Sequence, residues 1–120
     1  MDDFSWLVGI MEGEGCFGCY SKGPQVVFAS TDRDVVEKVS HLLEKNFTEQ
    51  KTSGKPCWRV DLKGRKALYV ANNLYPYLSQ RRKEQVDKMR LWKFKNSYKT
   101  EGYTPRLKKE ISLPVFNYKV

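Results

Sequence analysis

Two carboxylates, Glu12 and Glu14, close an apolar stretch near the start of the chain and flank Gly13. If this stretch is a helix, the acids lie at its carbonyl end, which carries a negative partial charge of about half an electron and therefore requires a compensating cation. A hard divalent metal held by carboxylate and carbonyl oxygens would supply one. Gly9 and Gly13 are four residues apart and leave one helix face without side chains, so two helix backbones can approach closely. The pattern predicts two helices packed side by side, each delivering an acid to a shared metal site.

The nine residues with this pattern resemble the LAGLIDADG motif of homing endonucleases. They read Leu7-Val8-Gly9-Ile10-Met11-Glu12-Gly13-Glu14-Gly15, and Leu7, Gly9, Ile10 and Gly15 fit the motif directly. Glu12 and Glu14 stand where the family has its two acids. The alternative is an ordinary amphipathic helix that ends in a glycine-rich turn, which leaves the paired acids unexplained.

The length and charge of the chain agree with a small nucleic-acid-binding domain. Its 120 residues are enough for one domain, and 22 Lys and Arg against 14 Asp and Glu give a net charge of +8. Because 13% of the residues are aromatic, the chain is not a disordered basic tail. A folded basic domain indicates a polyanionic partner, most often nucleic acid, although a solvated basic surface is the simpler alternative.

The cysteines and the N-terminus favour an intracellular protein, and the resemblance implies that it works with DNA, in a bacterial or phage-infected cytoplasm or an organelle. Three cysteines are an odd number, no basic signal-peptide segment precedes them, and no apolar run approaches the roughly 20 residues of a membrane span. Cys16 and Cys19 lie three apart in a predicted strand, so their thiols diverge and zinc is not expected. We expect neither secretion nor membrane association.

The order of predicted elements is helix, strand, strand, helix, strand, strand, helix, helix. The expected ranges are helix 4–12 capped by Asp3, strands 16–22 and 25–30 with a turn at Gly23-Pro24, a helix capped by Thr31 or Asp32, strands near 47–52 and 57–62, a helix from Gly64, and a helix over 79–95. This is an α+β domain over residues 1–95, followed by a basic and then apolar tail at 96–120. The resemblance implies a saddle-shaped, four-stranded antiparallel sheet with helices on one face.

Alternation along the strands assigns the two faces of that sheet. Phe17, Cys19, Val26, Phe28, Trp58, Val60 and Leu62 are expected to face the helices. The open face then carries Tyr20, Lys22, Gln25, Val27, Arg59, Asp61 and Lys63, which we predict to bind DNA, alongside Cys16, Gly18, Ala29 and Cys57. A ribbon of strands fits the major groove, where Arg and Lys read guanine, Gln reads adenine and Asp reads cytosine. The sequence does not show which residues of 47–52 face outward, so Thr48, Glu49, Gln50 and Lys51 are not assigned to either face of the sheet.

The resemblance also implies roles for single residues. Glu14 would bind Mg²⁺, or another divalent ion such as Mn²⁺, with the Gly13 carbonyl as a further ligand. Glu12 would be structural and bond backbone N–H groups at the other helix. Arg81 would stabilise charge in the active site, with Arg82 as the alternative if the register slips by one. Ser30 stands where many relatives have a polar residue that organises water.

Two further sets of residues complete the predicted site. Phosphate contacts are expected from Arg33, Arg65, Lys66, Arg82 and Lys83. A dimer interface is expected from Leu7, Gly9, Ile10, Glu12 and Gly13, because family members with a single motif work as homodimers.

The sequence therefore resembles a sequence-specific, Mg²⁺-dependent homing endonuclease. It would cut both strands of a long, partly palindromic DNA site as a homodimer, without a small-molecule cofactor, and its gene would ride in a mobile genetic element. One alternative is an RNA maturase or DNA-binding regulator that has the same fold but does not cleave. The other is an unrelated basic α+β protein.

Overall fold

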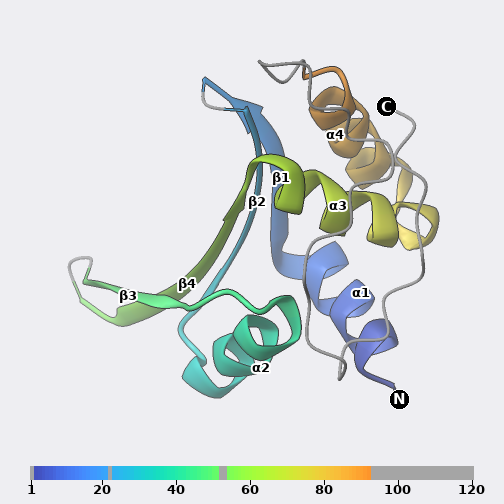
Figure 1. Cartoon of the computed structure of the whole chain (residues 1–120). Helices are drawn as coiled ribbons and strands as arrows, with labels where there is room; N and C mark the ends of the chain where they lie inside the picture. Colours follow the sequence, from blue (N-terminus) through green and yellow to red (C-terminus); the bar gives the residue numbers. More distant parts are fainter. Residues whose placement is uncertain (1, 22, 52–53, 93–120) are drawn as a thin grey trace.

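The chain folds into one curved sheet with helices packed on one side of it (Figure 1). A computed structural model describes residues 2–21, 23–51 and 54–92. Strands β1 (Gly15–Tyr20), β2 (Gly23–Ser30), β4 (Pro56–Lys63) and β3 (Thr48–Lys51) pair antiparallel in the order β1-β2-β4-β3. The helices are α1 (Asp3–Glu14), α2 (Arg33–Leu43), α3 (Gly64–Leu74) and α4 (Gln80–Arg90), with a 3-10 turn η1 (Tyr75–Tyr77) between the last two. The predicted α+β class, element order and four-stranded antiparallel sheet are confirmed.

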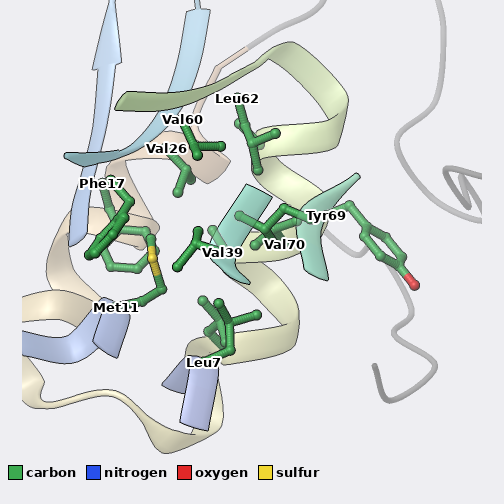
Figure 2. Close-up of a cluster of buried hydrophobic side chains, with 14 of the residues drawn as sticks. Leu7, Met11, Phe17, Val26, Val39, Val60, Leu62, Tyr69 and Val70 are labelled. Carbon is green, nitrogen blue, oxygen red and sulfur yellow. The ribbon is translucent and has the colours of Figure 1, made fainter. Parts of the chain in front are cut away.

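The core lies between the sheet and the helices (Figure 2). Its strand residues are those that alternation assigned to the helix side: Val26, Phe28, Val60 and Leu62 are each 1% exposed, and Trp58 packs against them half-buried. Cys19 shares this parity but is exposed, because it lies next to the last pair of the β1–β2 hairpin, past the buried Phe17. No helix among the described residues is both long and apolar enough to cross a lipid bilayer.

Helix α1 begins one residue earlier and ends two residues later than predicted. Asp2, not Asp3, is the N-cap, and its Oδ1 accepts the Ser5 N–H at 2.7 Å. Gly13 does not break the helix, which ends where Gly15 turns into β1 with an extended backbone. A Cβ on Gly15 would lie 2.7 Å from the Met11 carbonyl oxygen, so glycine is what lets the strand leave the helix so closely. Both acids therefore sit in the last turn of α1.

The β1–β2 turn is not at Gly23-Pro24, as the sequence had indicated. Tyr20, the last residue of β1, pairs with Gly23, so Gly23 and Pro24 already belong to β2 and the turn precedes them. Gly23 has φ +111°, and the indole of Trp92 lies over it, so a Cβ there would be 3.2 Å from Trp92 Cε2. Position 23 therefore requires glycine for two reasons: its positive φ angle and the close contact with the Trp92 indole.

The starts of α2 and α4 differ in detail from the predictions. Asp32 occupies the N-cap position of α2, but its carboxylate makes no capping bond; the Ser30 Oγ instead accepts the Asp32 N–H at 3.0 Å. Helix α4 is capped by Ser79, begins at Gln80 and ends at Arg90, short of the predicted position 95. Residues 96–120, the predicted tail, lie outside the described part of the chain.

Substituting Gly23 by alanine is expected to destabilise the domain more than the same change at Gly54. Both glycines have nearly the same backbone angle, φ +111° and +112°, which should cost an alanine about 1–3 kcal/mol at either position. A Cβ at Gly54 meets nothing within 4 Å, whereas at Gly23 it meets Trp92, and this adds roughly 1 kcal/mol. Urea unfolding of the two variants measures the difference. Equal losses would mean that the indole moves aside without cost.

Candidate functional site

The end of α1 and the start of α4 are joined by the side chain of Glu12. Its two carboxylate oxygens accept hydrogen bonds from the backbone N–H of Ser79 at 2.6 Å and from the Ser79 Oγ at 3.0 Å. In return, Arg82 Nε donates to the backbone carbonyl of Glu12 at 3.1 Å and lies 3.9 Å from its carboxylate. Each helix end thus supplies the partner that the other end lacks.

These contacts between Glu12, Ser79 and Arg82, called the joint below, resemble a capping box whose residues come from two helices. Ser79 is the N-cap of α4, and its Oγ accepts the backbone N–H of Arg82 three residues on. In a capping box that third residue is Glu or Gln and reaches back to the N–H of the N-cap residue. Here it is an arginine, and Glu12 from α1 supplies the carboxylate. Glu12 was expected to bond N–H groups at the other motif helix; its N–H partner is instead in its own chain.

Arg82 lies inside the domain and is not placed as a phosphate contact. It is 7% exposed, its guanidinium lies 5.8 Å from the centre of the Phe17 ring, and its Nη1 donates to Gln85 at 3.2 Å. Its charge faces the carbonyl end of α1, where a cation is favoured. The sequence predicted that a cation would compensate the two acids at this helix end. For Glu12, that cation is Arg82. This burial counts against Arg82 as a DNA contact or as the alternative to Arg81, and both roles stay predictions.

Glu14, in contrast, points to solvent. It is exposed and makes no hydrogen bond or ion pair with any residue that the structure describes. Gly13 is also exposed, and nothing lies within 4 Å of its Cβ direction. Among the described residues there is no cluster of three His, Cys, Asp or Glu side chains of the kind that holds a metal. The chain thus offers one carboxylate and one carbonyl as hard oxygen donors at this point.

Two other predicted catalytic residues come from segments that meet near this end of α1. Arg81 is exposed at the second position of α4, one residue from the buried Arg82 and two from Ser79. Ser30 is the last residue of β2, and the register that pairs Gly15 with Phe28 brings this strand end alongside the end of α1. The Ser30 Oγ accepts the Asp32 N–H, which leaves its own hydrogen free to donate.

One face of α1 is a strip of small residues open to solvent. Ser5, Gly9 and Gly13 are spaced four apart and are all exposed, and nothing lies within 4 Å of a Cβ built on either glycine. Ile10 is half-buried beside the strip. Leu7, expected at the same interface, is 1% exposed and belongs to the core of its own chain; its place in a dimer interface stays a prediction.

The open face of the sheet carries a connected polar network. Asp61 on β4 accepts from Gln25 Nε2 of β2 at 2.6 Å and from Arg59 Nη2 at 3.1 Å. Lys63 is exposed, and Val27 is half-buried opposite Asp61. Tyr20 is 57% exposed, and its ring lies over Gly18, where a Cβ would come within 3.0 Å of it. Lys22, predicted on the same face, lies outside the described residues.

The remaining predicted phosphate contacts have partners within the domain. Lys66 Nζ donates to the carbonyl of Glu44, just past the end of α2, at 2.9 Å, and burial lowers the pKa of this lysine. Arg33 pairs with Glu37 at 3.0 Å, and Lys83 lies over the Tyr75 ring at 5.6 Å. Arg65 is half-buried at the start of α3. Lys66 is thus already bound within the domain and not free to contact a phosphate without breaking this bond.

A groove beside the short strand β3 contains residues that the sequence left unassigned. It measures about 560 Å³ and is lined by Lys45, Asn46, Thr48, Gln50, Arg59, Asp61, Leu62, Lys63 and Lys66. Thr48 pairs with Arg59 and Gln50 with Cys57, and residues directly opposite in an antiparallel pair share a face. Thr48 and Gln50 therefore belong to the open face. Only the register with β4 reveals this, because four consecutive polar residues have no alternation.

Comparisons with known proteins agree with this architecture. A model of the LAGLIDADG-like domain family matches residues 2–99. The fold is similar to a crystal structure of the homing endonuclease I-CvuI in complex with the I-CreI target in the presence of 2 mM Mg, in which the DNA is not cleaved (TM-score 0.54, 18% identity, 70% of this chain and 60% of that chain). It is also similar to a crystal structure of the homing endonuclease I-TnaI (TM-score 0.48, 20% identity, 75% and 69%). A comparison with curated proteins gave no match.

Removing the carboxylate of Glu12 is expected to lower the free energy of unfolding by about 1–3 kcal/mol, because Ser79 and Arg82 lose a charged partner. Glu12→Ala and Ser79→Ala combined should cost less than the sum of the two single changes, since each breaks the same contact. Chemical denaturation of the three variants measures this, with Glu84→Ala, an exposed acid on α4, as the control. Additive losses would contradict the bond between the Ser79 hydroxyl and the Glu12 carboxylate, since alanine keeps the backbone N–H that donates to the other carboxylate oxygen.

Proposed function

Since this chain belongs to the family of LAGLIDADG-like domains, we propose that it is a sequence-specific double-strand DNA endonuclease of the homing type, working as a Mg²⁺-dependent homodimer. The observation that carries the proposal is the placement of the two motif acids. Glu12 is held within the domain, whereas Glu14 is left exposed at the same helix end, beside a strip of small residues and a polar sheet face. It would act wherever its target DNA lies inside the cell, as the product of a mobile element.

The donor set at the end of α1 fits a hard divalent cation. The Glu14 carboxylate and the Gly13 carbonyl are oxygen donors of the type that Mg²⁺ or Mn²⁺ prefers, and both residues are exposed. Remaining oxygens would come from water, from the DNA phosphate and from the second copy of the chain. When bound there, the metal would stabilise negative charge on the phosphate and lower the pKa of a water molecule.

The chain's own residues would orient the DNA around this point. Arg81 would place its positive charge against the phosphate that is cut, and the Ser30 hydroxyl would donate to water or phosphate near the end of β2. On the open face, Gln25, Arg59 and Asp61 have the groups that read adenine, guanine and cytosine in the major groove. In the free protein Gln25 and Arg59 both donate to Asp61, so base reading would exchange these bonds for bonds to DNA.

The strip on α1 supports a homodimer as the active form. Ser5, Gly9 and Gly13 present backbone rather than bulky side chains, so a second α1 could pack closely against the first. Such a pairing would bring two Glu14 carboxylates together, one for each DNA strand. A single copy of the chain supplies one Glu14, so cutting both strands would need two copies.

Glu14→Gln is expected to abolish cleavage while leaving DNA binding within about twofold, because the amide keeps the shape but loses the charge that holds the metal. The substrate is the DNA flanking the reading frame, rejoined without the insert, incubated with Mg²⁺ or Ca²⁺ and mapped for cut ends. Glu84→Gln, an exposed change on α4, is the control and should cleave normally. Binding without cleavage by the unsubstituted protein would favour the maturase or regulator, and cleavage by Glu14→Gln would refute the catalytic assignment.

Gly9→Leu is expected to give a folded monomer of 14.1 kDa in place of a dimer of twice that mass. The new side chain meets nothing in its own chain, and leucine favours helix over glycine by up to about 1 kcal/mol, so the melting temperature of the monomer should not fall. In the dimer, the same side chain would push the two α1 helices apart. Sedimentation measures the mass, with Lys88→Leu at an exposed position of α4 as the control. A dimer that persists in Gly9→Leu would place the interface elsewhere.

A further inference from the structure

We propose that Arg82 and Glu12 are positioning residues that hold the metal-binding end of α1 in place. Neither side chain would touch the metal. Together they would fix the last turn of α1 to the start of α4, and with it the Gly13 carbonyl and the Glu14 carboxylate. This inference rests on the proposed function for the identity of the ligand, although the joint itself is observed in the free protein.

Met11 anchors the last turn of α1 in the core, but the two residues at the end of the helix have little else to hold them. Gly13 and Glu14 are both exposed, and nothing packs against the Cβ direction of Gly13. The final backbone bond of the helix runs from the Gly15 N–H to the Met11 carbonyl. Glycine within a helix also lowers its stability by roughly 0.5–1 kcal/mol relative to alanine, so a turn of this composition frays readily without a lateral contact.

The lateral contact comes from the joint with α4, and it reaches the core. Arg82 Nε binds the Glu12 carbonyl, one residue before Gly13, while the guanidinium lies near the ring of the buried Phe17 on β1. The Glu12 carboxylate is in turn bonded twice to Ser79. The residue next to the proposed metal ligands is therefore tied to α4 through its main chain and its side chain, and Arg82 is itself packed beside β1.

Groups that orient metal ligands without touching the metal have measurable effects. Losing one typically lowers metal affinity by about 10–100-fold. The carbonyl of Gly13 and the carboxylate of Glu14 lie one and two residues beyond Glu12, so any fraying at Glu12 displaces both. A weaker Arg82 contact should thus weaken metal binding with little change in the DNA contacts made by the open face of the sheet, to which neither Arg82 nor Glu12 belongs.

The first arm of the test is hydrogen exchange in the free protein, which does not depend on nuclease activity. In Arg82→Gln, the Gly15 and Ser79 amides should exchange at least about tenfold faster, because local opening no longer breaks the joint. The Val70 amide, in the buried middle of α3, reports global unfolding and should change much less. Lys88→Gln removes one cation from the same helix at an exposed position and should change none of the three.

The second arm measures metal binding by the protein–DNA complex. Free Mn²⁺ is followed by electron paramagnetic resonance as it is added to the complex, so no cleavage is needed for the readout. In Arg82→Gln, the Mn²⁺ concentration at half-saturation should rise about tenfold or more, and in Lys88→Gln it should stay within twofold. Glu12→Gln and Arg82→Lys weaken the same joint in milder ways and replace Arg82→Gln if that variant does not fold.

The outcomes separate the two proposals. Faster local exchange together with weaker Mn²⁺ binding supports the positioning role. Unchanged exchange at Gly15 and Ser79, or faster exchange with unchanged Mn²⁺ binding, overturns it while leaving the proposed nuclease intact. If the unsubstituted complex binds no Mn²⁺, both the proposed function and the positioning of a metal fail, and the joint is a structural contact only.

Discussion

The architecture depends on two helix ends of opposite partial charge that face each other. The carbonyl end of α1 carries a negative partial charge, and two glutamates there would add to it. The sheet places the amino end of α4, which carries a positive partial charge, against that point, and Glu12 reaches the N–H of Ser79. The Glu12 carboxylate is therefore unfavourable at the carbonyl end of its own helix but favourable at the amino end of α4. Arg82 completes the compensation at the Glu12 carbonyl.

This arrangement neutralises one acid and leaves the other exposed. Glu14 follows Glu12 by two residues, so about 200° of helix rotation separates them and they cannot share a partner. Glu12 faces α4, and Glu14 remains exposed next to the start of β1. Under the proposed function this difference is useful, because an acid already paired with arginine would hold a metal poorly. The charge that the fold does not balance is the one available to an external cation.

Local patterns in the sequence were sufficient for the parts of this structure that depend on near neighbours. Alternation identified the buried residues of β2 and β4, and the spacing of Gly9 and Gly13 identified the open strip on α1, since both periods are properties of a single element. The Gly-Pro pair misplaced the hairpin turn because the role of Gly23 depends on Trp92, far along the chain. The face of β3 could not be predicted because it depends on the register with β4. Arg81 and Arg82 looked equivalent for a similar reason: only the cap at Ser79 and the contact with Glu12, 70 residues away, decide which arginine is buried.

Helix α4 makes contacts at both ends that bear on the proposed activity. Its first turn holds the end of α1, and just past its last turn the Trp92 indole lies against Gly23 in the β1–β2 hairpin. Eleven helical residues span about 16 Å, so one rigid element sets the distance between the Glu14 region and the tip of the hairpin. If the hairpin reads bases and Glu14 serves the scissile phosphate, α4 fixes how far from the recognised bases the cut is made. Cleavage position would then be a property of this helix as much as of the motif, and the joint at Glu12 would serve both.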